Sequence, residues 1–166
     1  EGANYVAPDL NMSPEDAAAL IWSEYEKAAA VGAVPVAGAS LGGFYAAWLA
    51  GRTGIRAALL NPAVEPWDIV KLYNGEYKSF TGDKIVRVTP DYADQLRALD
   101  AKPFADPARV LMVLCTGDEV LDWRRAAKRF SDVQSIVIDG SDHRISCFEE
   151  YAVGVRDFLL AGSDRS

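Results

Sequence analysis

The sequence of 166 residues contains one histidine and only two cysteines. No Cys-x-x-Cys pair is present, so the cysteine-rich and histidine-rich sites that bind structural zinc are not expected. We therefore predict no metal site. Two reduced cysteines are typical of a cytoplasmic protein, and this is the location that we predict.

Basic residues are also scarce, since 17 Lys and Arg stand against 24 Asp and Glu and give a net charge of -7. Nucleic acids and anionic membrane surfaces bind basic faces, so we predict neither as a partner. No apolar run approaches the roughly 20 residues of a membrane span. Half of the residues are apolar, which is enough for one buried core, and we expect a single domain over residues 1–166.

Short apolar runs alternate with helical patterns along the chain. Strands are expected at residues 4–7, 34–38, 56–60, 84–88, 110–115 and 135–138. Helices are expected from Pro14, after Ser40, over 66–72, after 89–91, over 122–130 and over 148–160. This alternation predicts a three-layer α/β fold, with a mostly parallel sheet and helices on both faces. In such a sheet the site lies beyond the carboxyl ends of the strands.

One strand end carries the sequence Gly-Ala-Ser-Leu-Gly at residues 38–42, and an alanine-rich helical stretch follows. A strand, a sharp turn with serine at its apex and a helix together form the pattern of a nucleophile elbow. The turn would lift the hydroxyl of Ser40 above the sheet and point the N–H of Leu41 toward an oxyanion. We expect both Gly38 and Gly42 to be required, because a side chain at either would collide with the neighbouring strand or helix. A glycine-rich turn with a bystander serine is the alternative.

Two later strand ends carry groups that could activate a serine. Asp118 follows the strand at 110–115 and His143 follows the strand at 135–138, so the chain order is Ser, Asp, His, as in α/β-hydrolases. A neutral imidazole must take the serine proton, and a carboxylate must orient the imidazole. His143 is the only candidate base. Asp118 is the favoured acid, while Asp122, Glu119 and Asp142 remain open, and Asp122 is also suited to capping the next helix.

The chain resembles the YqiA-like esterases, a small bacterial branch of the α/β-hydrolases. The matching stretches are residues 38–46, 61–66, 116–122, 142–143 and 148–151. The resemblance implies a serine esterase or thioesterase that acts on acyl esters without a metal or organic cofactor. It maps the nucleophile to Ser40, the acid to Asp118 and the base to His143.

The N-terminal part departs from this family pattern. Family members open with a strand that runs into a His-Gly-Phe loop, which supplies a second oxyanion N–H, whereas this sequence opens at what looks like the family's second strand, residues 4–7. Either a preceding segment of the natural protein lies outside this sequence, or a minimal protein re-pairs its sheet and takes the second donor from elsewhere or from a partner chain. Loss of one oxyanion donor typically costs about 3 kcal/mol of barrier, so we expect weak activity if the loop is absent.

The sequence thus predicts a serine hydrolase that acts on small to medium acyl esters or thioesters through an acyl-enzyme. Residues 64–107 are expected to form a small lid-like insertion, with Trp67 and Tyr77 as substrate contacts, although core packing is an alternative for these aromatics. Asn61 is expected either to line the site or to start an Asn-Pro turn. A non-catalytic ligand- or protein-binding module and an acyltransferase are alternative functions, and a homodimer is left open. Trp67, Tyr73, Tyr77 and Phe80 are the aromatics of the insertion that could cover the acyl group.

Overall fold

The computed structural model describes residues 5–71, 75–78 and 85–161. The chain divides into two compact units, of which the first comprises Glu1–Gly32 and Glu65–Leu99 and the second comprises Ala33–Val64 and Asp100–Ser166. The expected insertion overlaps the later part of the first unit. That the whole chain acts as one domain remains a prediction.

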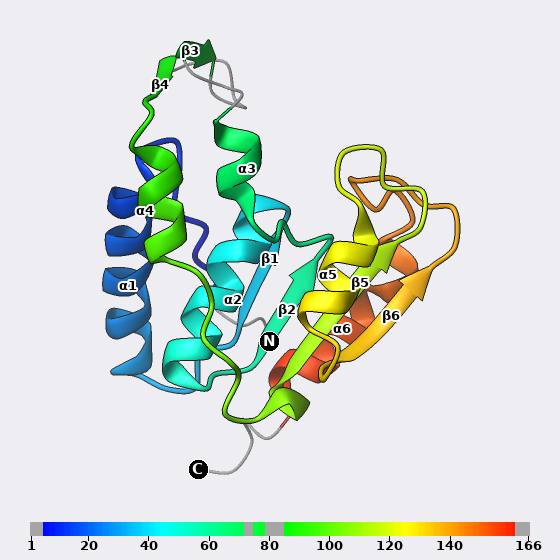
Figure 1. Ribbon diagram of the computed structural model, residues 1–166. Helices are drawn as coiled ribbons and strands as arrows, with labels where there is room; N and C mark the ends of the chain where they lie inside the picture. The colour runs from blue at the N-terminus through cyan, green and yellow to red at the C-terminus, as the bar shows by residue number, and fades with distance from the viewer. Residues whose placement is uncertain (1–4, 72–74, 79–84, 162–166) are drawn as a thin grey trace. The chain divides into compact units, whose positions relative to one another are not determined.

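The second unit is built on a four-stranded sheet. Its strands are β1 (Val36–Ala39), β2 (Ala57–Leu60), β5 (Val110–Cys115) and β6 (Gln134–Ile138), in the order β1-β2-β5-β6 (Figure 1). All three neighbouring pairs are parallel. The parallel sheet predicted from the sequence is thus confirmed, and the carboxyl ends of its strands meet at one edge.

Helices cover both faces of this sheet. Figure 1 shows α2 (Leu41–Thr53) and α5 (Trp123–Arg129) on one face and α6 (Glu149–Leu160) on the other. The first face buries Ala46, Ala47, Ala50, Leu59, Met112 and Ala126. The opposite face buries Ala58, Val113, Cys115, Ile138 and Val155. Successive residues of β5 alternate between these two clusters and all six are buried, which explains why its sequence is a continuous apolar run.

In its described residues, the first unit contains three helices and a two-stranded antiparallel sheet. The helices are α1 (Pro14–Ala29), α3 (Pro66–Val70) and α4 (Tyr92–Ala98), and α4 packs against both of the others. The hairpin pairs β3 (Gly75–Lys78) with β4 (Ile85–Val88). The sequence predicted β4 but placed residues 75–78 in a loop, and that prediction is wrong.

The start of α1 is formed as its sequence predicts. The side chain of Ser13 accepts the N–H of Asp16, so it satisfies one of the donors that a helix leaves free at its start. Pro14 occupies the first helical position, where its missing N–H costs nothing.

The strand expected at residues 4–7 is not formed over its described part. Residues 5–7 are irregular, the side chains of Tyr5 and Val6 are exposed, and Asn4 lies outside the described residues. An extended segment becomes a strand only where a neighbour supplies hydrogen-bond partners, and a local apolar pattern does not reveal that neighbour. In the described ranges, β1 pairs with β2 alone.

The turn between β1 and α2 has the conformation of a nucleophile elbow. Ser40 has a φ of 53° and a ψ of -120°. A Cβ atom on Gly38 would lie 2.1 Å from the carbonyl oxygen of Gly42, so Gly38 is required, as predicted. A Cβ atom on Gly42 meets nothing within 4 Å, so the predicted collision there is wrong. The close approach is instead at Gly43, where a Cβ atom would lie 2.8 Å from the Cβ of Pro62.

These contacts predict very different losses of stability for two alanine substitutions in one motif. Gly38→Ala places a methyl group against the backbone carbonyl of Gly42, which can move only if the turn distorts. The substitution should therefore lower the free energy of unfolding by about 3 kcal/mol. Gly42→Ala has room and lies in the first turn of a helix, so it should stay within about 1 kcal/mol of wild type. Urea denaturation followed by circular dichroism measures both, and equal losses would contradict this account of the turn.

Candidate active site

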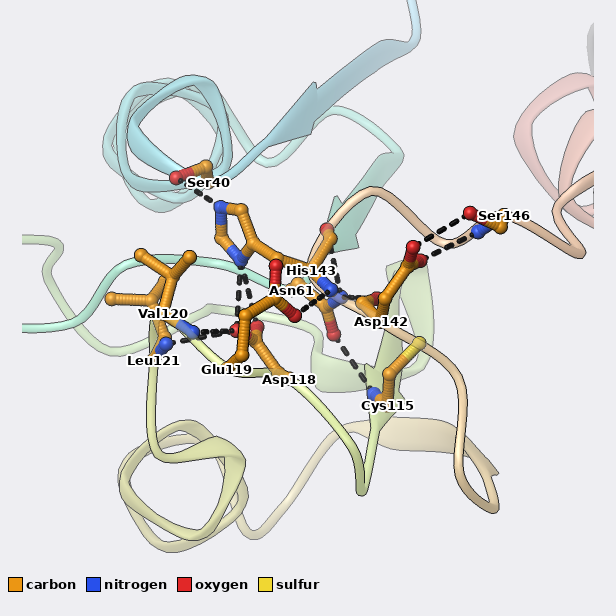
Figure 2. Close-up of polar contacts among 10 residues, drawn as sticks. All are labelled: Ser40, Asn61, Cys115, Asp118, Glu119, Val120, Leu121, Asp142, His143 and Ser146. Atoms are coloured by element: carbon orange, nitrogen blue, oxygen red, sulfur yellow. Dashed lines mark hydrogen bonds and ion pairs between the residues drawn. The ribbon is translucent and has the colours of Figure 1, made fainter.

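Three strand ends bring a hydroxyl, an imidazole and a carboxylate together. Ser40 follows β1, Asp118 follows β5 and His143 follows β6. Figure 2 shows the imidazole of His143 between the other two side chains. Its Nε2 lies 3.1 Å from Ser40 Oγ, and its Nδ1 lies 2.8 Å from Asp118 Oδ2 and 3.0 Å from Oδ1. The structure therefore brings together the three residues that the sequence selected.

The contact with Asp118 sets the tautomer of the imidazole. A carboxylate only accepts hydrogen bonds, so a neutral His143 ring carries its proton on Nδ1 and presents the lone pair of Nε2 to the Ser40 hydroxyl. The Asp118 side chain is 1% exposed and that of His143 is 17% exposed. Water therefore screens this pair little, and the interaction is stronger than on an open surface.

The Asp118 carboxylate is fixed by its own loop as well. Its Oδ1 accepts the backbone N–H groups of Val120 and Leu121, each at 2.8 Å. A buried charge needs such partners, because it has lost its hydration. The carboxylate is therefore oriented independently of the histidine.

Gly117 allows the loops that carry Asp118 and His143 to approach. A Cβ atom at this position would lie 2.8 Å from the carbonyl oxygens of both Gly140 and Ser141. Any larger residue would push the loop after β5 away from the loop after β6. This role was not predicted from the sequence, where its only local sign is a glycine directly before Asp118.

The competing carboxylates make other contacts. Asp122 accepts the N–H of Arg124 and so caps α5. Glu119 Oε2 accepts the backbone N–H of His143 at 3.0 Å. Asp142 accepts the hydroxyl of Ser146 at 2.6 Å. Among the four candidate acids, which are these three and Asp118 and which all lie in the described part of the chain, only Asp118 has a hydrogen bond to the imidazole.

Asp142 stabilises the turn that follows the histidine. The hydroxyl and the backbone N–H of Ser146 hold the pKa of the Asp142 carboxyl below its usual value. A lowered pKa in the folded state means that the contribution to stability is present above the usual carboxyl pKa and is lost as the pH falls through the lowered one. The turn is therefore held at neutral pH.

Cys115 lies beneath the site and does not compete as a nucleophile. Both cysteines are free thiols, and Cys115 is fully buried at the end of β5. Burial raises the pKa of the Cys115 thiol, which keeps it protonated at neutral pH. The thiolate is the reactive form, so this group is inert.

The backbone around Ser40 is tied to the end of β2. The Ser40 N–H donates to the carbonyl of Leu60 at 3.0 Å, and the Ser40 carbonyl accepts the N–H of Ala63 at 2.9 Å. The next residue, Leu41, is the first of α2, so its N–H has no acceptor within the helix and lies at the positive end of the helix dipole. This is the geometry expected of an oxyanion donor, and that role remains a prediction.

The three expected substrate contacts lie in different settings. Asn61 is 3% exposed, and its carboxamide contacts the backbone rather than open space, which does not fit a substrate contact. Trp67 lies in α3, with the guanidinium of Arg97 6.0 Å from its ring centre. Tyr77 lies in β3 and is 40% exposed. Both aromatics belong to the first unit and their contact with substrate remains a prediction, while Tyr73 and Phe80 lie outside the described residues.

Neither a metal cluster nor a membrane helix is found in the ranges that the structure describes. No group of three or more His, Cys, Asp and Glu side chains there could hold a metal ion. No described helix combines the length and the apolar character needed to cross a bilayer.

The chain has an α/β fold with a mostly parallel sheet, and this fold matches that of α/β-hydrolases of known structure. The chain is similar to Est1E from Butyrivibrio proteoclasticus, with 18% identity over 90% of this chain and 71% of that one and a TM-score of 0.69. It is similar to mouse alpha/beta hydrolase domain-containing protein 10, with 16% identity over 89% and 69% of the two chains and a TM-score of 0.65. A monoacylglycerol lipase from Paleococcus ferrophilus matches with 16% identity over 90% and 76% and a TM-score of 0.61. At these identities the likeness establishes the fold alone.

The family follows from the sequence. The model of the uncharacterised protein family UPF0227 matches residues 2–160, and the chain belongs to this family. UPF0227 is the YqiA family, so the resemblance drawn from the sequence motifs is confirmed.

The contacts of the acids predict how two asparagine substitutions differ. Asp118→Asn keeps the shape of the side chain but lets an amide donate to the ring, which permits the wrong tautomer. If Asp118 orients His143 as the aspartate of a catalytic triad does, the rate at which a fluorophosphonate labels Ser40 should fall by about 10⁴-fold. Asp122→Asn keeps the helix cap and should leave the labelling rate unchanged. Equal rates for the two variants would contradict the assignment of Asp118.

Proposed function

We propose that this protein is a serine hydrolase that cleaves small to medium acyl esters or thioesters through an acyl-enzyme. The observation that carries the proposal is the chain of contacts from Ser40 Oγ to His143 Nε2 at 3.1 Å and from His143 Nδ1 to the buried Asp118 carboxylate at 2.8 Å. A serine hydroxyl is a weak nucleophile on its own, and this arrangement is the one that activates it.

The proposed reaction has two steps. In acylation, Ser40 Oγ attacks the carbonyl carbon while its proton moves to His143 Nε2. The imidazolium then gives that proton to the departing alcohol or thiol, and the carbon–oxygen or carbon–sulfur bond breaks. In deacylation, water repeats the sequence against the acyl-enzyme, releases the acid and restores Ser40. Asp118 stays ionised throughout and stabilises the imidazolium.

The oxyanion of each tetrahedral intermediate needs hydrogen-bond donors. We propose the Leu41 N–H as one of them, because it starts α2 directly after the nucleophile. One such donor is worth about 10²–10³ in kcat. The chemistry requires no metal or organic cofactor.

The names of proteins with this fold support an ester substrate. They include a monoacylglycerol lipase, Est1E with ferulic acid bound and an esterase domain from Rhodothermus marinus. Each bears on this chain as an analogy of fold, so the acyl chain length and the choice between ester and thioester are questions for assay.

The test is hydrolysis of a p-nitrophenyl ester series from acetate to decanoate, with an acyl thioester alongside. Ser40→Ala should lower kcat by about 10⁴-fold or more. Ser135→Ala is the matched control, because this exposed serine lies in β6 of the same unit and outside the site, and its kcat should equal that of wild type.

Two outcomes would contradict the proposal. Hydrolysis that survives Ser40→Ala would assign the activity to another group. No hydrolysis by a folded protein with any of these substrates would favour a binding module with the hydrolase fold. Faster transfer to an added alcohol than to water would instead identify an acyltransferase with the same mechanism.

A further inference from the structure

Asn61 is a buried polar side chain whose hydrogen bonds reach two other segments, the end of β5 and the loop that carries His143. It directly follows β2 and is 3% exposed. Its Nδ2 donates to the backbone carbonyls of Asp142 at 3.2 Å and His143 at 3.1 Å. Its Oδ1 accepts the backbone N–H of Cys115 at 2.8 Å (Figure 2). A buried amide this well satisfied is held in one orientation.

The Asn61 side chain extends the hydrogen bonding between β2 and β5 by one more bond, past the residue at which the backbone turns away from β5. The Asn61 N–H still donates to the carbonyl of Val113 at 2.8 Å, as a further ladder residue would. Its φ of 38° then turns the chain away, and Oδ1 accepts the N–H of Cys115 that would otherwise be unpaired. Asparagine suits this position because it tolerates a positive φ and its carboxamide has the groups of a peptide.

The same short segment also holds the nucleophile. The N–H of Ala63 donates to the Ser40 carbonyl at 2.9 Å, and Pro62 lies against Gly43 in the first turn of α2. Residues 61–63 therefore contact the backbone of the serine on one side and the backbone of the histidine on the other. A displacement of this segment would change the separation of the two reacting groups.

The histidine depends on such support because it lies in a loop. His143 stands between the end of β6 and the start of α6, and Ile145, two residues later, has a φ of 54°. The His143 carbonyl is held by Asn61 and its N–H by Glu119. Glu119 is exposed, so its bond competes with water, whereas the Asn61 bonds are shielded.

We propose that Asn61 is a positioning residue for His143. By holding the carbonyls of Asp142 and His143 it places the imidazole between Ser40 and Asp118, and it does so without contact with substrate. The consequence for turnover rests on the proposed function, while the consequence for the histidine ring does not.

Two variants remove this support in different ways. Asn61→Ala deletes all three side-chain hydrogen bonds. Asn61→Asp has the same size and tolerates the positive φ, and it keeps the acceptor for Cys115 but turns a carboxyl oxygen toward the two carbonyls. Circular dichroism and thermal unfolding establish that each variant is folded before it is used.

The single histidine makes a direct readout practicable. All imidazole nitrogen signals in an ¹⁵N spectrum come from His143, so the tautomer and the hydrogen-bonded Nδ1 proton are observed without assignment. Wild type should show the Nδ1–H tautomer with a downfield proton. In both Asn61 variants that proton should be lost or should exchange rapidly, and the ring should become a mixture of tautomers.

Kinetics supply the second readout. A shift of about 1 Å in a reacting group can cost 10²-fold in rate, so kcat should fall by about 10²-fold in both variants. KM should stay close to wild type, because the side chain is buried and does not meet substrate. A substrate-contact role would instead raise KM.

Thr116→Val is the matched control for a nonspecific loss of hydrogen bonds in the connection between β6 and α6. The Thr116 hydroxyl donates to Asp139 at 2.8 Å and accepts the N–H of Gly140 at 2.8 Å. It therefore holds the first residues of the loop that follows β6 and carries His143. The control should lower the unfolding temperature but keep the histidine spectrum and kcat of wild type.

The outcomes separate the inference from the proposed function. If folded Asn61 variants keep the wild-type tautomer and kcat, or if Thr116→Val alters both as strongly, the positioning role is overturned. If wild type hydrolyses nothing yet the Asn61 variants alone lose the Nδ1 proton, the proposed function fails and the positioning role stands.

Discussion

The site depends on the backbone conformation of one residue. Ser40 has a φ of 53°, a region that costs a residue with a side chain about 1–3 kcal/mol, and nothing local to a serine favours it. The conformation is held by close backbone approaches on either side of the turn between β1 and α2. Gly38 lies against the carbonyl of Gly42, and Gly43 lies against Pro62. Its result is that the hydroxyl stands at the start of a helix, within hydrogen-bond distance of His143.

The other parts of the site are placed by backbone contacts between loops. The parallel sheet brings three strand ends to one edge, but a strand end alone leaves a following loop free to move. Gly117 lets two loops meet, the N–H groups of Val120 and Leu121 fix the acid, and Asn61 joins the histidine loop to the ends of β2 and β5. The hydrogen bonds among these contacts are between 2.8 and 3.2 Å long, and such bonds are stronger in the protein interior than in water, so they hold the loops in place.

Much of this arrangement was accessible from the sequence, for definite reasons. The apolar run at 110–115 is a strand because both faces of the sheet are covered, and the order Ser, Asp, His marks three strand ends that a parallel sheet must align. The capping role of Asp122 was also readable, because a helix start is a local pattern.

What the sequence did not reveal depends on neighbours distant in the chain. Gly42 and Gly43 look alike in the motif, and only the position of Pro62 decides which of them has no room for a side chain. The hairpin strand at 75–78 pairs with β4 without an apolar pattern of its own, whereas residues 5–7 are all apolar and yet do not pair. From the sequence, Asn61 was expected to line the site or to start an Asn-Pro turn, because its three hydrogen-bond partners lie more than fifty residues away along the chain.

The central claim is that His143 activates Ser40, and the intact mass of the protein after reaction with a fluorophosphonate tests it most directly. The account predicts one phosphonyl group per chain, carried on the peptide that contains Ser40, and no adduct on folded His143→Ala in the same time. An adduct on another residue, an adduct that forms equally without His143, or no adduct on folded wild type would contradict it.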